Sequence, residues 1–130
     1  MSLQSRQTYS GGVATFFYQN GVAGACGTVH SDDDLIAAID QTRYGDPSQV
    51  SSLCGKKVTI TNTNNQKTVT VTIADDCPTC DNENSIDLSV RAFTQIATEE
   101  EGEVPSKSLG NTSQTRTAAR TRTMVLTQIL

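Results

Sequence analysis

The chain has 130 residues, a formal net charge of −4 and no tryptophan, and 35% of its residues are hydrophobic. This length fits one domain that can bury roughly two-thirds of its unfolded surface. The acidic balance argues against nucleic acid as a partner, because a phosphate backbone attracts basic residues. The chain contains no apolar run of about 18 residues that could span a membrane.

Threonine alternates with apolar residues in several segments, which is typical of half-buried strands and predicts a mainly β protein. Residues 1–10 are interpreted as an extension, and GGVATFFY at 11–18 predicts a first strand. A Gly-rich turn is expected at 19–27. Two later runs, KKVTITNT and KTVTVTIA, are separated by a short polar turn and predict a β-hairpin.

Two short helices are predicted. The segment SDDDLIAAID at 31–40 begins with a residue suited to an N-cap and has acidic residues in its first turn. The segment VRAFTQIA at 90–97 follows Ser89 as N-cap, and its apolar side indicates that Phe93 belongs to the core. Residues 42–55 are predicted to form a loop.

The C-terminal part carries weaker signals. Residues 106–130 contain four basic residues and no acidic one, and form a divergent basic tail. Within it, 108–123 is polar and typical of a disordered segment, whereas MVLTQIL at 124–130 predicts a last strand or a collapsed apolar end. Asn111 begins an N-glycosylation sequon, which fits a secreted protein.

Four cysteines, Cys26, Cys54, Cys77 and Cys80, allow three disulfide pairings. A zinc site would want two close pairs, and the single His30 is distant in sequence from all but Cys26. A redox CxxC opens a helix, whereas this one precedes acidic residues that would raise the thiol pKa. Two disulfides in a small secreted domain are therefore favoured. The first residues hold no signal peptide, so either the protein is cytosolic or a signal was removed, and the expected disulfides favour the second alternative.

These segments together resemble a known family. GGVATFFY followed by GACG resembles the first strand and turn of the double-psi β-barrel of expansins, barwin-like proteins and RlpA-like domains. The segments LCGKKVTITN, TVTIADDCPTC and IDLSVRAFTQIA resemble its later parts in the same order. The resemblance covers about residues 11–105. The sequence is similar to the single-domain fungal type called loosenin. The resemblance implies a mainly β protein, a six-stranded double-psi β-barrel with two short helices. A monomer without a metal or cofactor is expected.

The resemblance also implies a polysaccharide groove. Thr15 and Asp75 would line it, and Asp87 would be the essential carboxylate. Each acid has a structural alternative, because Asp87 can cap the helix that follows it and Asp75 can be a turn acid at the end of the hairpin. The implied disulfides are Cys26–Cys54 and Cys77–Cys80.

Binding of sugar rings needs flat aromatic side chains, and the chain has only six aromatic residues. Strand alternation places Phe16 or Phe17 inside the protein. Tyr18 and Tyr44 are therefore the expected platform, with Asp76 as a further substrate contact.

The chain departs from the family pattern in three ways. Val90 replaces the proline that usually follows Asp-Leu-Ser, although Ser89 can still cap the helix. After GEVP at 102–105 the usual closing strand is missing or replaced, so that closure would depend on 124–130. The 130 residues are expected to contain no counterpart of the second, carbohydrate-binding domain of full expansins.

Inverting hydrolysis of a glycosidic bond needs two placed carboxylates. In expansin-related endoglucanases one matches Asp87, whereas Gln19 stands at the position of the other, and an amide cannot activate water. The resemblance therefore favours extracellular, non-hydrolytic loosening of cellulose or chitin, with weak endoglucanase activity as a remaining alternative.

Inhibitors of papain-like cysteine proteases form a different class that shares the CPxC motif and the hairpin. Inhibition of a cysteine protease is therefore a second hypothesis. Retention of Thr15, Asp75 and Asp87 together favours the polysaccharide over the protease, because an inhibitor has no evident need for a polar groove.

Overall fold

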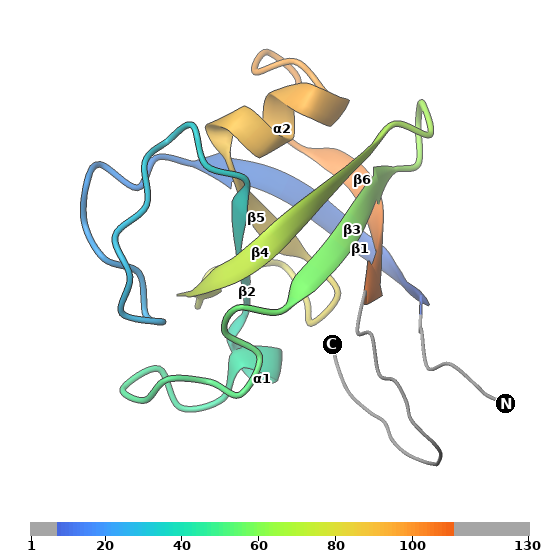
Figure 1. Cartoon of the computed structure of the whole chain (residues 1–130). Coiled ribbons are helices and arrows are strands. Elements are labelled where there is room, and N and C mark those ends of the chain that lie inside the picture. Colours follow the sequence, from blue (N-terminus) through green and yellow to red (C-terminus); the bar gives the residue numbers. More distant parts are fainter. Residues whose placement is uncertain (1–7, 111–130) are drawn as a thin grey trace, which may run out of the picture.

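The computed structural model describes residues 8–110, which form a closed barrel with strand order β1-β5-β2-β4-β3-β6 (Figure 1). Six strands and two short helices within these residues confirm the expected architecture. In chain order the elements are β1 (Thr8–Phe17), β2 (Ile36–Asp40), α1 (Gln41–Tyr44), β3 (Lys57–Asn62), β4 (Thr68–Cys77), β5 (Ile86–Ser89), α2 (Val90–Ile96) and β6 (Val104–Gly110).

The barrel is held by pairings between strands that are distant in sequence. β5 runs parallel to β1 and antiparallel to β2, and β2 runs parallel to β4. The predicted hairpin is confirmed as the antiparallel pair of β3 and β4. Every strand has two neighbours, so the sheet has no open edge in the described residues.

The core fills the barrel and the space under α2, which covers one end (Figure 1). Phe93 is fully buried, as predicted, and its ring lies 5.0 Å from that of Phe16. Phe16 packs against the buried cluster, so it is the inward residue of the Phe16–Phe17 pair. The helix begins at Val90 without the family's proline, because the side chain of Ser89 caps it.

The predicted helix at 31–40 is wrong. Its first part is a turn, in which the backbone N–H of Asp34 donates to the carbonyl oxygen of Ser31. The apolar residues 36–40 form strand β2, and all five are buried. A strand covered on both faces is a continuous apolar run without alternation, so periodicity does not separate it from a buried helix. The second helix is instead α1, which begins at Gln41 and extends into the segment 42–55 predicted to be a loop.

The expected loss of the closing strand is also wrong. β6 runs from Val104 to Gly110 and pairs with both β1 and β3, so the barrel closes without residues 124–130. Its buried positions after Val104 are Ser106, Ser108 and Gly110, so the inward side lacks the apolar residues that mark a strand. The predictions for 111–130, including the sequon at Asn111, lie outside the described residues.

Both implied disulfides are confirmed. Cys26 pairs with Cys54 and thereby joins the connection at 18–35 to the loop before β3. Cys77 pairs with Cys80 at the end of β4. Such bonds are compatible with secretion, since they persist in oxidising compartments. Within residues 8–110 no helix is long and apolar enough to cross a membrane.

The hydroxyl group of Ser89 connects β5 to α2 and β2, so a substitution of this residue tests how the fold is held together. Its Oγ donates to the carbonyl oxygen of Asp34 at 2.6 Å and accepts from the backbone N–H groups of Ala92 and Ile36. Ser89→Ala removes all three bonds, and we expect the free energy of unfolding to fall by about 1–2 kcal/mol. Urea denaturation measures this change. The exposed Ser52→Ala is the control, and an equal effect of both substitutions would contradict the role given to Ser89.

Candidate functional site

A row of four residues crosses four neighbouring strands. Thr15 on β1 is in register with Asp87 on β5, Asp87 with Ala38 on β2, and Ala38 with Asp75 on β4. The chain neighbours of Thr15, Asp87 and Ala38 within these strands pack in the core cluster, so these three side chains point away from it. The outer face of the barrel therefore brings Thr15, Asp87 and Asp75 together, as the sequence predicted.

A β-bulge decides the orientation of Asp75. Ala37 is paired with Ile73, but Ala38 is paired with Asp75, so Ala74 is an extra residue in β4. In a regular strand of the same sequence, alternation would place Asp75 on the same side as the core residue Ile73. The bulge moves this carboxylate to the outer face, and no local sequence signal predicted it.

Thr15 and Asp87 form the central contact of the row. The Thr15 Oγ1 donates to the Asp87 Oδ1 at 2.8 Å. Burial raises the pKa of Asp87, the hydrogen bond from Thr15 lowers it, and the charge of Asp75 raises it, with a net increase above the usual value. The side chain of Ser89, and not that of Asp87, caps α2. The Asp87 carboxyl group is less favourable in its ionised form than an exposed one.

Asp75 holds the connection between β1 and β2 against β4. Its Oδ1 accepts from the backbone N–H groups of Ala25, at 2.6 Å, and Asp76, at 2.8 Å. The loop approaches so closely that a Cβ at Gly24 would lie 2.6 Å from the carbonyl oxygen of Ala74. One oxygen of Asp75 is thus committed to backbone groups, and the residue shapes the wall of the site.

Asp76 does not join the row. It is in register with the core residue Ile39 and, by alternation, lies on the other side of the strand from Asp75. Its Oδ1 is buried and has no hydrogen-bond partner among the described residues. Burial and the charges of Asp75 and Asp40 raise its pKa. The expected substrate contact through Asp76 is therefore not supported by its position.

The two expected platform residues differ. Tyr44 is only 3% exposed and its hydroxyl donates to the carbonyl oxygen of Gln49, so its assignment to substrate binding is wrong. It packs inward because α1 directly follows the buried strand β2. Tyr18 is 49% exposed and donates to Glu99 Oε1 at 3.1 Å, and this bond and the charge of Glu99 raise its pKa. Tyr18 is the available ring just beyond β1.

Gln19 is unsuited to acid–base chemistry for two reasons. It is an amide, and it is only 9% exposed. Its Nε2 donates to the carbonyl oxygen of Val22 at 2.6 Å, so the side chain braces the turn that follows β1. The structure shows a structural role for the residue at this position.

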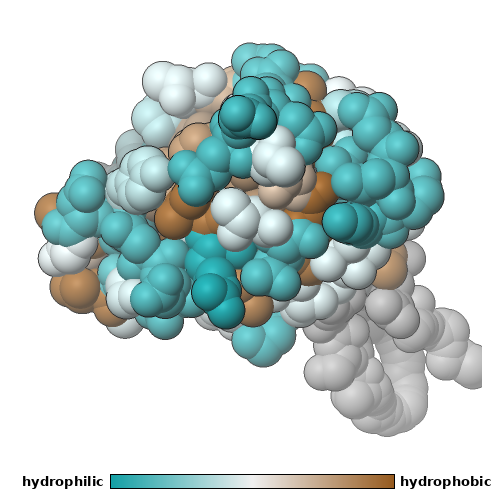
Figure 2. Space-filling view, turned by 90° about the horizontal axis from the view of Figure 1, so that it is seen from above, coloured by the Kyte–Doolittle hydropathy of each residue, from teal (hydrophilic) through white to brown (hydrophobic). Residues whose placement is uncertain are grey.

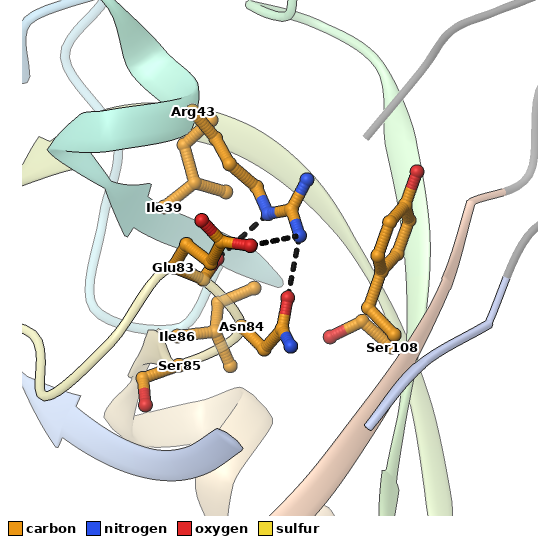
Figure 3. A pocket seen from close by; sticks show the side chains of 8 residues that line it. Ile39, Arg43, Glu83, Asn84, Ser85, Ile86 and Ser108 are labelled. Carbon is orange, nitrogen blue, oxygen red and sulfur yellow. Dashed lines mark hydrogen bonds and ion pairs between the residues drawn. The ribbon is translucent and has the colours of Figure 1, made fainter. Parts of the chain in front are cut away.

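A small pocket surrounds Arg43 at the end of the barrel near α1 (Figure 3). Arg43 Nε donates to the carbonyl oxygen of Glu83 at 2.7 Å, and its guanidinium also bonds to the Asn84 side chain. Its Cζ lies 4.1 Å from the ring centroid of Tyr9. Arg43 therefore fastens the loop before β5 to β1. Within residues 8–110 no group of three His, Cys, Asp or Glu side chains is placed to hold a metal ion.

A closed six-stranded barrel with these two parallel pairings is a double-psi β-barrel, and the polar row on its outer face is a candidate binding surface. The family model described as "lytic transglycolase" matches residues 9–107. The chain therefore belongs to the RlpA-like double-psi β-barrel family, and the resemblance read from its motifs is confirmed.

Solved structures agree with this placement. A papain inhibitor from Streptomyces is 30% identical, with a TM-score of 0.68, over 80% of this chain and 93% of the inhibitor. A point mutant of the Clavibacter michiganensis expansin in complex with cellohexaose is 22% identical, with a TM-score of 0.70, over 85% of this chain. This chain covers 54% of that expansin, about half its length. Cerato-platanin 3 from M. perniciosa has a TM-score of 0.56 at 14% identity. No curated protein matches the chain.

The raised pKa of Asp87 gives a stability test of the site. When the folded-state pKa exceeds the unfolded one, the ionised carboxylate destabilises the fold above that pKa, and protonation relieves the cost as the pH falls. Asp87→Asn keeps an acceptor for Thr15 and removes the charge. We expect this variant to be more stable than the wild type at neutral pH, and the difference to vanish toward the ordinary aspartate pKa of 3.8.

Urea denaturation over a pH series measures both curves. The exposed Asp81→Asn is the matched control, for which we expect no comparable gain. A variant at Asp87 that is less stable than the wild type at neutral pH would show that the ionised carboxylate supports the fold instead.

Proposed function

We propose that the chain is a secreted protein that binds cell-wall polysaccharide, cellulose or chitin, on the outer face of its barrel and loosens it without hydrolysis. The hydrogen-bonded pair of Thr15 and Asp87 carries the proposal. A partly exposed carboxylate accepts hydrogen bonds from sugar hydroxyl groups, and a hydrogen bond to an ionised acceptor is stronger than a neutral one. Thr15 holds the carboxylate in one orientation.

Hydrolysis requires a second free carboxylate, and the row does not provide one. Asp75 Oδ1 is bonded to two backbone N–H groups, and Gln19 is a buried amide. One carboxylate can compete for hydroxyl groups between packed glycan chains but cannot serve as both acid and base across a sugar bond. The cellohexaose complex of the expansin supports a glycan as ligand, while the name of the family model makes product release an outcome to measure.

Binding and product release are tested together. The purified protein is mixed with amorphous cellulose or chitin, and the bound fraction and the soluble reducing ends are measured. We expect binding without release, and at least about tenfold weaker binding for Asp87→Ala, because bonds to a charged group contribute roughly 1.5–3 kcal/mol. The exposed Asp81→Ala is the control and keeps wild-type binding. Release of oligosaccharides that Asp87→Ala abolishes would contradict the non-hydrolytic mechanism.

A second candidate function is inhibition of papain-like cysteine proteases. One observation favours it: the papain inhibitor is covered over 93% of its length at 30% identity, whereas the expansin is covered over about half of its length. Small disulfide-bonded proteins can inhibit proteases through a protruding, rigid loop, because a preformed loop loses little entropy on binding.

Inhibition is tested with papain and a small fluorogenic peptide, so that competition for the active site is read directly. If this function holds, the wild-type protein slows peptide cleavage at nanomolar concentration and remains intact by mass spectrometry. Full protease activity at a large molar excess of the protein would remove this candidate. Inhibition without any retention on cellulose or chitin would remove the first.

A further inference from the structure

The connection between β1 and β2 carries a tight reversal at its tip, residues 19–24, called here the tip segment. The backbone N–H of Val22 donates to the carbonyl oxygen of Gln19 at 3.1 Å. Asn20 and Gly21 have φ angles of 58° and 73°, the left-handed pair of a type I′ turn, which Asn-Gly adopts readily. The tip segment is therefore a defined turn.

Contacts on both sides hold the tip segment in place. The backbone N–H of Gln19 donates to Asp32 Oδ1 at 2.7 Å, and the Gln19 side chain donates to the carbonyl oxygen of Val22. Just past the tip, Ala25 is bonded to Asp75. Cys26 is joined to Cys54 by a disulfide. Little conformational freedom is left for the tip segment to lose on binding a partner.

The same connection exposes apolar side chains. Of the large hydrophobic residues that are exposed within 8–110, four belong to residues 18–35 and only Val50 lies elsewhere. Val22, on the tip, is 63% exposed. Figure 2 shows brown, hydrophobic atoms at the side of the molecule where this connection projects in Figure 1. The fold does not require an apolar residue at the tip of an Asn-Gly turn, so Val22 is available for binding.

We propose that the tip segment enters the active-site cleft of a papain-like cysteine protease, with Val22 filling an apolar subsite of that cleft. The proposal rests on the second candidate function and assigns its contact surface. A cleft is concave and largely apolar, so it accepts a protruding turn with an aliphatic side chain. The turn does not suit a glycan, because sugar rings stack on flat aromatic faces, and it is too small for the roughly 800 Å² per partner of a stable dimer.

Val22 does not belong to the polar row, so the two proposed functions can be tested separately. The variant Val22→Asp places a charge where an apolar contact is proposed and leaves the core unchanged. Val50→Asp is the matched control, because Val50 is 67% exposed, also lies in a loop and belongs to neither surface. Papain inhibition, binding to cellulose and chitin, and the unfolding temperature are measured for the wild type and both variants.

We expect Val22→Asp to raise the inhibition constant at least about tenfold, the effect of losing a central interface residue. Val50→Asp keeps the wild-type constant, and neither variant changes the unfolding temperature or glycan binding. Equal inhibition by Val22→Asp and the wild type would overturn the assignment of the tip segment while leaving the inhibitor function standing. Absence of inhibition by the wild type would overturn both.

Gly21→Val tests the rigidity of the turn while keeping Val22. A β-branched residue at a φ of 73° strains the turn, so we expect weaker inhibition and cleavage within the tip segment. Cleavage is detected as two fragments, since all four cysteines lie after residue 25 and no disulfide joins the pieces. Wild-type inhibition without cleavage would show that a preformed turn is not required.

Discussion

The short strand β5 lies between β1 and β2, and the pairing on its two sides determines both the core and the site. Its alternate residues Ile86 and Leu88 point into the barrel and are buried, while Asp87 between them points out. β5 is parallel to β1 and antiparallel to β2. In this register Asp87 lies between Thr15 on β1 and Ala38 on β2. A slip of one residue would bury the carboxylate and expose the core residues.

The outward-facing acidic residue of β5 lowers the stability of the fold in its ionised form. The carboxyl group of Asp87 is partly removed from water and stands near Asp75, and both effects disfavour its ionised form. The barrel tolerates this cost because the residues beside it pack tightly, from Ala14 on β1 to Phe93 on α2. The position of Asp87 is therefore not explained by the stability of the fold, which is consistent with the binding role that we propose for the row.

The parts of the fold that the sequence predicted are those with local patterns. The Thr-rich hairpin alternates clearly, Ser89 is a common N-cap residue, and the ordered motifs identified the barrel. The misassigned parts depend on their surroundings. β2 is apolar at nearly every position because both its faces are covered, and β6 turns serines inward where a strand usually shows apolar residues.

The sequence predicted some residues of the candidate site correctly and others wrongly. Thr15, Asp87 and Asp75 meet as the motifs implied, whereas Tyr44 is buried through its position after β2 and Asp76 faces away. Ala38, at the centre of the row, was hidden in a predicted helix. Arg43, which fastens the loop before β5, stood in a segment without a recognisable pattern.

The bulge at Ala74 determines which side of β4 Asp75 faces. In a regular strand of the same sequence every acidic residue of the row would remain, yet Asp75 would lie on the same side of β4 as Ile73, toward the barrel interior. The β1–β2 connection would then lose the carboxylate that now holds Ala25. Among barrels of this family, residue identities alone therefore do not define the surface. The bulge in β4 decides which of the acidic residues face outward.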